Sequence, residues 1–168
     1  MKDILDTINI AEAIKRGPSA VQQRRKRSGK EIVQVSTLDE LKSVISETIK
    51  NEGLECDLNF IDVSEIQDFS YLFYNFYEFN GDISEWDTHK AVKFDYMFYN
   101  SKYTGEHGDI SNWDVQSVQT ASRMFYNSKY DGDISGWQLN SLNVKLSPQF
   151  LAGAPLAKTR KHWPKRFR

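Results

Sequence analysis

Four aspartates recur through the middle of the chain at nearly equal intervals, and their type and spacing could support chemistry. Asp82, Asp109 and Asp133 each begin the tripeptide Asp-Ile-Ser, and Asp57 begins the variant Asp-Leu-Asn. Successive copies are 25, 27 and 24 residues apart. Stacked in a column, these carboxylates could bind a hard cation, which prefers several oxygen ligands. The alternative, which the sequence favours, is that each aspartate hydrogen-bonds the backbone of its own turn.

A second series of residues with the same period could form a binding surface. Three tyrosines occupy the middle of a recurring Phe-Tyr-Asn tripeptide, and two more stand three residues before them. Exposed aromatic rows of this kind recognise proteins or sugars. The alternative, which the sequence favours, is that the rings pack between neighbouring repeats. The candidate aromatic face consists of Tyr71, Tyr74, Tyr96, Tyr99 and Tyr126.

Apolar residues at fixed positions in each copy predict the core of the fold. Ile or Trp stands four residues after each aspartate, and Phe precedes the tyrosine of each Phe-Tyr-Asn tripeptide. Bulky residues in register bury one another when repeats stack. The predicted core residues are Ile61, Trp86, Trp113, Trp137, Phe73, Phe98 and Phe125.

Motifs for catalysis or cofactor binding are absent from the sequence. The three histidines are scattered, and the sequence contains neither a nucleophile-elbow motif nor a phosphate-binding Gly-Lys loop. The single cysteine, Cys56, has no Cys or His at metal-ligand spacing. No pair of carboxylates stands out for acid–base work. The sequence therefore predicts a protein that is not an enzyme and that uses no metal or other cofactor.

The charges are strongly segregated along the chain. Residues 1–30 carry a net charge of +5, residues 31–156 carry −12, and residues 157–168 carry +6, which together give −1. Residues 1–30 combine apolar side chains near helical spacing with a basic run. We predict an anchor peptide that docks on a partner protein, with nucleic-acid binding and a solvated arm as alternatives. The anchor residues are Ile4, Leu5, Ile8, Arg24, Arg25, Lys26 and Arg27.

Each repeat is predicted to contain one short strand and one short helix. The Asp-Ile-Ser-x-Trp segment alternates polar and apolar residues, which favours a strand. The segment 66–73 has apolar residues at positions 66, 69, 72 and 73, which is helical spacing. One such unit cannot bury its own apolar face, so units stack in rows. The prediction is an α/β repeat solenoid, leucine-rich-repeat-like, with four stacked strand–short-helix repeats of about 25 residues.

The repeats need a cap at the end where they begin. Thr37 and Glu40 have the spacing of a capping box, which predicts a capping helix that Gly53 ends. A small strand is predicted within residues 31–35. The predicted domains are a basic N-terminal arm (1–30), an N-terminal cap of strand and helix (31–56), the repeats (57–156) and a basic C-terminal tail (157–168).

The repeat motif resembles a known family. Gly-Asp-Ile-Ser-x-Trp-Asp followed by Met-Phe-Tyr-Asn is similar to the BspA-like repeats, which are leucine-rich-repeat-like units. Related repeats occur in mycoplasma-type surface lipoproteins and in proteins of gut bacteria and their phages. The resemblance covers roughly residues 38–155, and it departs from the pattern where Gln138 replaces the Asp after Trp137. It implies adhesion, binding or a structural role without catalysis.

Together these features predict a non-enzymatic interaction or structural module. Residues 1–10 do not form a signal-peptide core, and no apolar run is long enough to span a bilayer. We therefore expect synthesis in a cytoplasm and a place in a phage or virion, docked by the basic termini on protein partners. The alternatives are a cytoplasmic regulator associated with nucleic acid and an inhibitor that presents an acidic surface. We expect no small-molecule ligand.

Overall fold

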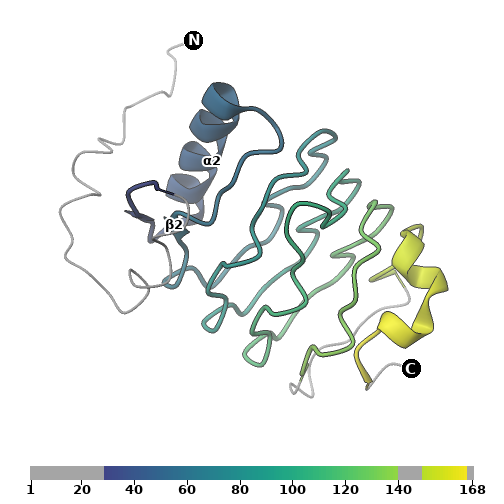
Figure 1. Ribbon diagram of the computed structural model, residues 1–168. Coiled ribbons are helices and arrows are strands. Elements are labelled where there is room, and N and C mark those ends of the chain that lie inside the picture. The colour runs from purple at the N-terminus through teal and green to yellow at the C-terminus, as the bar shows by residue number, and fades with distance from the viewer. Residues whose placement is uncertain (1–28, 140–148, 166–168) are drawn as a thin grey trace, which may run out of the picture.

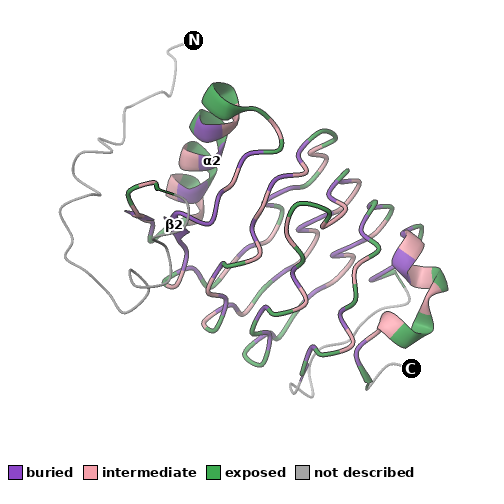
Figure 2. Cartoon of the chain, in the orientation of Figure 1, coloured by how far each residue is buried: buried purple, intermediate pink, exposed green. Residues whose placement is uncertain are grey.

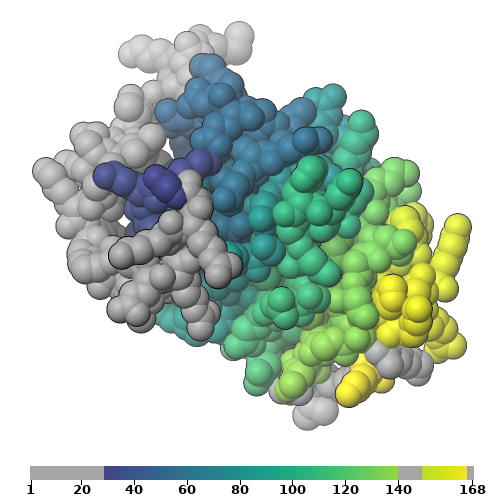
Figure 3. Space-filling view, viewed as in Figure 1, coloured from purple at the N-terminus to yellow at the C-terminus, as the bar shows by residue number. Residues whose placement is uncertain are grey.

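The computed structural model describes residues 29–139 and 149–165, which form a mostly irregular domain around a large aromatic core. One helical cap lies at each end of the domain, and successive segments of the chain lie side by side between them (Figure 1, Figure 3). Among the described residues, no helix combines the length and the apolar character that a membrane crossing requires. The regular elements are β1 (Val33–Gln34), α2 (Leu38–Glu52), β2 (Ile61–Asp62), and the 3-10 helices η2 (Pro155–Lys158) and η3 (Arg160–His162).

Helix α2 covers the N-terminal end of the core, and its predicted capping box is present. The Thr37 hydroxyl accepts a hydrogen bond from the Glu40 backbone N–H (3.2 Å), and the Glu40 carboxylate accepts one from the Thr37 N–H (3.2 Å). Gly53 ends the helix with φ 93° and donates its N–H to Ile49. Strand β1 pairs in parallel with β2, with Val33 opposite Ile61.

The predicted short helix in each repeat is wrong for the described repeat segments, whereas the predicted strand is present only in part, as β2 of the first repeat and as the isolated parallel bridge between Asp57 and Asp82. The segment 66–73 is a series of turns, in which the Leu72 N–H bonds the Phe69 carbonyl over 3.2 Å. Tyr71 and Asn75 have φ values of 62° and 54°, which a right-handed helix excludes. Turns closed between residues i and i+3 place the buried residues Val63, Ile66, Phe69 and Leu72 three apart, and this spacing imitates that of a helix. Buried and exposed stretches alternate along the repeats (Figure 2).

Hydrogen bonds between segments one repeat apart replace the expected helices. Four alternate N–H groups of 69–75 donate to four alternate carbonyls of 93–99 over 2.9–3.0 Å. The same pattern, with the same lengths, joins 94–100 to 120–126. In both sets the earlier repeat donates and the later repeat accepts, so all of these bonds point the same way along the molecule.

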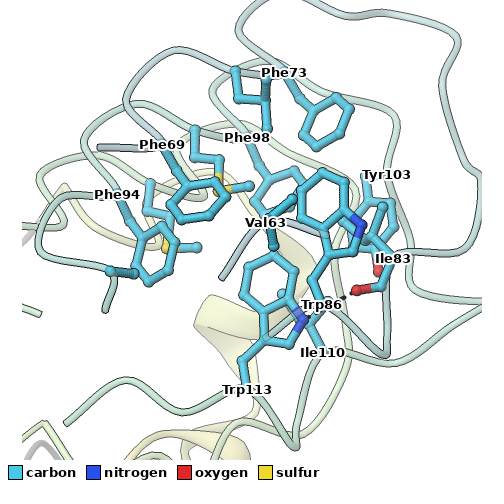
Figure 4. Packing of buried hydrophobic residues seen from close by; sticks show 14 of the residues in the cluster. Val63, Phe69, Phe73, Ile83, Trp86, Phe94, Phe98, Tyr103, Ile110 and Trp113 are labelled. Carbon is cyan, nitrogen blue, oxygen red and sulfur yellow. Dashed lines mark hydrogen bonds between the residues drawn. The ribbon is translucent and has the colours of Figure 1, made fainter. Parts of the chain in front are cut away.

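Aromatic columns fill the space inside these turns. Phe73, Phe98 and Phe125 stack in register, with 5.5 Å between successive ring centroids. The Trp113 indole N–H donates to the Ile83 carbonyl over 3.1 Å (Figure 4). Trp86 and Trp137 make the equivalent bond to the preceding repeat. These residues and Ile61 are at most 4% exposed.

The C-terminal end of the core is closed by η2 and η3. Leu156 of η2 is fully buried, and the Trp163 indole N–H donates to its carbonyl over 2.8 Å. The Ile134 N–H donates to the His162 carbonyl over 3.0 Å, which ties this cap to the last Asp-Ile-Ser turn.

Replacing Trp113 by Ala is expected to lower the free energy of unfolding by about 3–5 kcal/mol, because it leaves a cavity in the core. Trp113→Phe keeps a ring but removes the donor to the Ile83 carbonyl, so a loss of about 1–3 kcal/mol is expected. Urea denaturation measures both, with the exposed neighbour Asn112→Ala as a control that should change stability by less than about 0.5 kcal/mol. A loss below about 1 kcal/mol for Trp113→Ala would contradict a core role.

The left-handed backbone at Asn100 gives a second test of the fold. Asn100 has φ 53°, a conformation that strains a β-branched residue, so Asn100→Val should cost roughly 1–3 kcal/mol. Asn100→Gly tolerates this backbone and loses only the side-chain bonds, so its cost should be clearly smaller. Equal losses in thermal denaturation would show that the side-chain bonds, rather than the backbone conformation, matter at this position.

Candidate functional site

The recurring aspartates stabilise turns. Each accepts a hydrogen bond from the backbone N–H two residues later, over 2.7–2.9 Å, as an Asx turn requires. The turn interpretation is therefore confirmed for these carboxylates. Among the residues that the structure describes, no three His, Cys, Asp or Glu side chains gather in a way that could hold a metal ion. The four pairs are Asp57–Asn59, Asp82–Ser84, Asp109–Ser111 and Asp133–Ser135.

The five predicted tyrosines lie together on one surface, which we call the tyrosine strip. Tyr71 stacks on Tyr96 with 5.0 Å between ring centroids and 6° between ring planes. A second column contains Tyr74, Tyr99 and Tyr126, with centroid distances of 5.1 and 5.0 Å. Tyr71 and Tyr74 are arranged edge to face, with 5.5 Å between ring centroids and 64° between ring planes, which joins the two columns. The strip is most open at the first repeat, where Tyr71 is 50% and Tyr74 is 40% exposed.

The local backbone explains why these rings face outward. Tyr71 and Tyr96 have positive φ values of 62° and 56°, so the chain turns there and Phe73 and Phe98 enter the core two residues later. Asparagines support the second column, because Asn tolerates the left-handed conformation and can also bond sideways. The Asn100 side-chain amide donates to the Asn75 side-chain carbonyl over 3.1 Å.

Arg123 continues the first tyrosine column into the third repeat. Its guanidinium carbon lies 5.6 Å from the Tyr96 ring centroid, within the range of a cation–π interaction. Its Nη1 donates to the Tyr96 hydroxyl over 2.8 Å. Its Nε donates to the side chain of Gln149, one repeat further on. A planar cation therefore takes the place of a third ring in this column.

An open hollow of about 600 Å³ lies between α2 and the first tyrosine column. Leu38 and Lys42 line it from α2, and Tyr71 and Tyr96 line it from the strip. The remaining lining residues come from three successive repeats and are all polar. They are Asp68, Ser70, Lys93, Asp95 and Ser122.

Both carboxylates of the hollow are held in place. Asp68 accepts a hydrogen bond from the Ser70 N–H (2.9 Å) and pairs with the Lys93 ammonium (3.2 Å). Burial by itself would raise the pKa of Asp68, but the bonds from Ser70 and Lys93 outweigh it and lower the pKa below its usual value. Asp95 accepts the Ser122 N–H over 2.6 Å and the Thr120 hydroxyl over 2.8 Å.

The structure brings together only part of what the sequence singled out. The five tyrosines form one surface, and the predicted core residues lie in the interior behind it. The seven predicted anchor residues, all within 1–28, lie outside the described residues.

Sequence reasoning missed two exposed features of the first repeats. Tyr77 is 56% exposed, but Lys102 and Lys129 occupy its place in later repeats, so a search for recurring aromatics passes over it. The Asp68–Lys93 pair joins unlike residues from equivalent positions of two repeats. Opposite charges one repeat apart were the signal that could have revealed it.

Comparison with known proteins places the chain in a family. Residues 40–163 match the family described as Mycoplasma protein of unknown function, DUF285. Neither the curated proteins nor the solved structures gave a match. The family match spans well over half of the 168 residues, and it agrees with the BspA-like motifs of the repeats. The chain therefore belongs to the DUF285 family.

Proposed function

We propose that this protein is a non-enzymatic interaction module, in which the repeats stack as one solenoid and the tyrosine strip binds a protein partner. The observation that carries the proposal is the strip itself. Five tyrosines from three repeats lie in stacked contact, and their most exposed members are half open to solvent. A core function alone would not require aromatic rings at these outward positions.

The solenoid part of the proposal is supported by contacts at a constant sequence separation. The central hydrogen bonds, the stacked phenylalanines and the indole bonds all join residues about one repeat apart. Contacts of this kind join each central repeat to the one before it and the one after it, which supports a solenoid arrangement. A column of contacts that is repeated in this way also makes a long, rigid face.

The strip has properties that suit a protein partner. Neighbouring rings cover most of the ring faces, so the strip presents ring edges and phenol hydroxyls. Tyrosine is enriched at protein interfaces because it offers a large apolar body with a polar tip. Stacking already restricts the rings, so binding costs less conformational entropy than it would for free side chains.

We also propose that the basic termini attach the module to a larger assembly such as a phage particle. The support is the charge layout, in which an acidic segment (31–156, net −12) separates two basic ends. Part of the C-terminal group is described by the structure: η2, η3 and the residue that follows Pro164 carry four basic side chains and no acidic one. The alternative of a regulator associated with nucleic acid uses the same charges.

A photo-cross-linking amino acid in place of Tyr74 tests the strip in cells of the native source. We expect a discrete adduct with a protein, because Tyr74 would lie in the interface. The matched control carries the cross-linker at Asn112, which is exposed but away from the strip, and should give no adduct. Adducts of equal yield at both positions, or an adduct that nuclease removes, would contradict the proposal.

Deletion of residues 1–28 tests attachment. The deletion keeps Lys30, which pairs with Glu52 over 2.5 Å, so the fold should survive and thermal denaturation should confirm it. Quantitative mass spectrometry of purified particles should find the full chain at fixed stoichiometry and the truncated chain depleted. If both chains are absent from particles, and the full chain co-purifies with nucleic acid in a complex that weakens steeply with salt, the regulator alternative replaces the proposal.

A further inference from the structure

The hollow beside the tyrosine strip has a polar, charge-balanced lining. Two carboxylates, Asp68 and Asp95, and two ammonium groups, Lys42 and Lys93, line it. An anionic ligand would meet the carboxylates and a cationic ligand would meet the ammonium groups, so neither sign of charge is favoured. Because the hollow is open and polar, an apolar ligand would gain little from entering it. The lining therefore suits a neutral ligand rich in polar groups.

The polar groups of the hollow both donate and accept hydrogen bonds. An ionised carboxylate has about four acceptor sites, and Asp68 uses only part of this capacity on Ser70 and Lys93. The ammonium groups of Lys42 and Lys93 supply donors. A hydroxyl group acts as donor and acceptor at once, so neighbouring hydroxyls on one ligand match carboxylate and ammonium groups that lie side by side. The Asp68–Lys93 pair offers that combination at 3.2 Å.

Tyr71 supplies an apolar platform at the same place. Tyr96 stacks on one face of the Tyr71 ring, Tyr74 meets Tyr71 edge to face, and no second described ring lies parallel to the Tyr71 ring. The side chain is 50% exposed and lines the hollow together with Leu38 of α2. The face of an aromatic ring is negative and attracts the slightly positive C–H groups of a ligand.

A sugar ring combines these features, because it is uncharged, carries neighbouring hydroxyls and has a face of C–H groups. We propose that the hollow between α2 and the tyrosine strip is a binding site for a neutral saccharide, which stacks on Tyr71 and hydrogen-bonds Asp68 and Lys93. The site extends along three repeats, from Lys42 to Ser122, so a chain of several sugar units fits it better than a single unit. This inference goes beyond the proposed function, since it assigns a second ligand to the hollow, which shares Tyr71 and Tyr96 with the tyrosine strip.

An array of immobilised neutral, sialylated and sulfated glycans tests the site with the full chain. Wild-type protein is expected to bind neutral glycans and not the acidic ones. Asp68→Asn and Tyr71→Ala should each weaken this binding by about tenfold or more, while Tyr71→Phe should retain it because the ring face remains. Thermal denaturation checks that each variant is folded, and Lys42→Ala, on the exposed side of α2, gives an independent variant with the same expected loss.

Variants that change only the strip or only the hollow separate this proposal from the function of the strip. Tyr126 lies in the strip but does not line the hollow, so Tyr126→Ala should leave glycan binding unchanged. Asp68→Asn should leave the protein cross-link from position 74 unchanged. Binding of no neutral glycan, binding of acidic glycans only, or equal binding by wild type and Asp68→Asn would overturn the saccharide site, and none of these results would affect the strip.

Discussion

The structure depends on one constraint, the exchange of backbone hydrogen bonds between segments one repeat apart. Alternate N–H groups of each central segment donate to the next repeat, so they are not available for a helix. The intervening residues close short turns within their own repeat. This division satisfies the backbone polar groups without regular secondary structure, as a buried backbone requires. It also fixes the register in which the side chains of successive repeats meet.

The two candidate surfaces follow from this register. Alternate N–H groups bond within their own repeat or to the next repeat, and this alternation requires positive φ at Tyr71, Asn75 and their equivalents. The backbone at those residues directs the tyrosines outward. Equivalent residues stack directly on one another, so identical residues form columns and unlike residues form pairs. The tyrosine strip is a column of the first kind, and the Asp68–Lys93 pair in the hollow is of the second kind.

The sequence predicted correctly those features that follow from the regular spacing of residues. The repeat spacing gave the columns of phenylalanine and tryptophan, and the Thr37–Glu40 pattern gave the capping helix. It failed on the backbone of the repeats, because turns that span three residues and helices bury side chains at similar spacing. The sequence did not predict the hollow, because its lining residues come from α2 and from non-identical positions of three repeats. Only a fixed register brings those residues together.

The two central sets of backbone hydrogen bonds, from 69–75 to 93–99 and from 94–100 to 120–126, point in one direction and give this part of the molecule a dipole moment. Peptide dipoles largely cancel in an ordinary sheet, but those of the groups bonded between 69–75 and 93–99 and between 94–100 and 120–126 add, as they do in an α-helix. Bonds elsewhere in the repeats, such as that from the Val92 N–H to the Gln67 carbonyl, run the opposite way and reduce the sum. The carbonyl oxygens that accept these central bonds face the end that bears α2, a helix in which acidic side chains outnumber basic ones by four to two. The opposite end, at η2 and η3, is basic. Within the described residues, the peptide dipoles of these central bonds and the charges of α2, η2 and η3 therefore point the same way, and the attraction of the C-terminal end for an anionic surface would act over about 10 Å at 0.1 M salt.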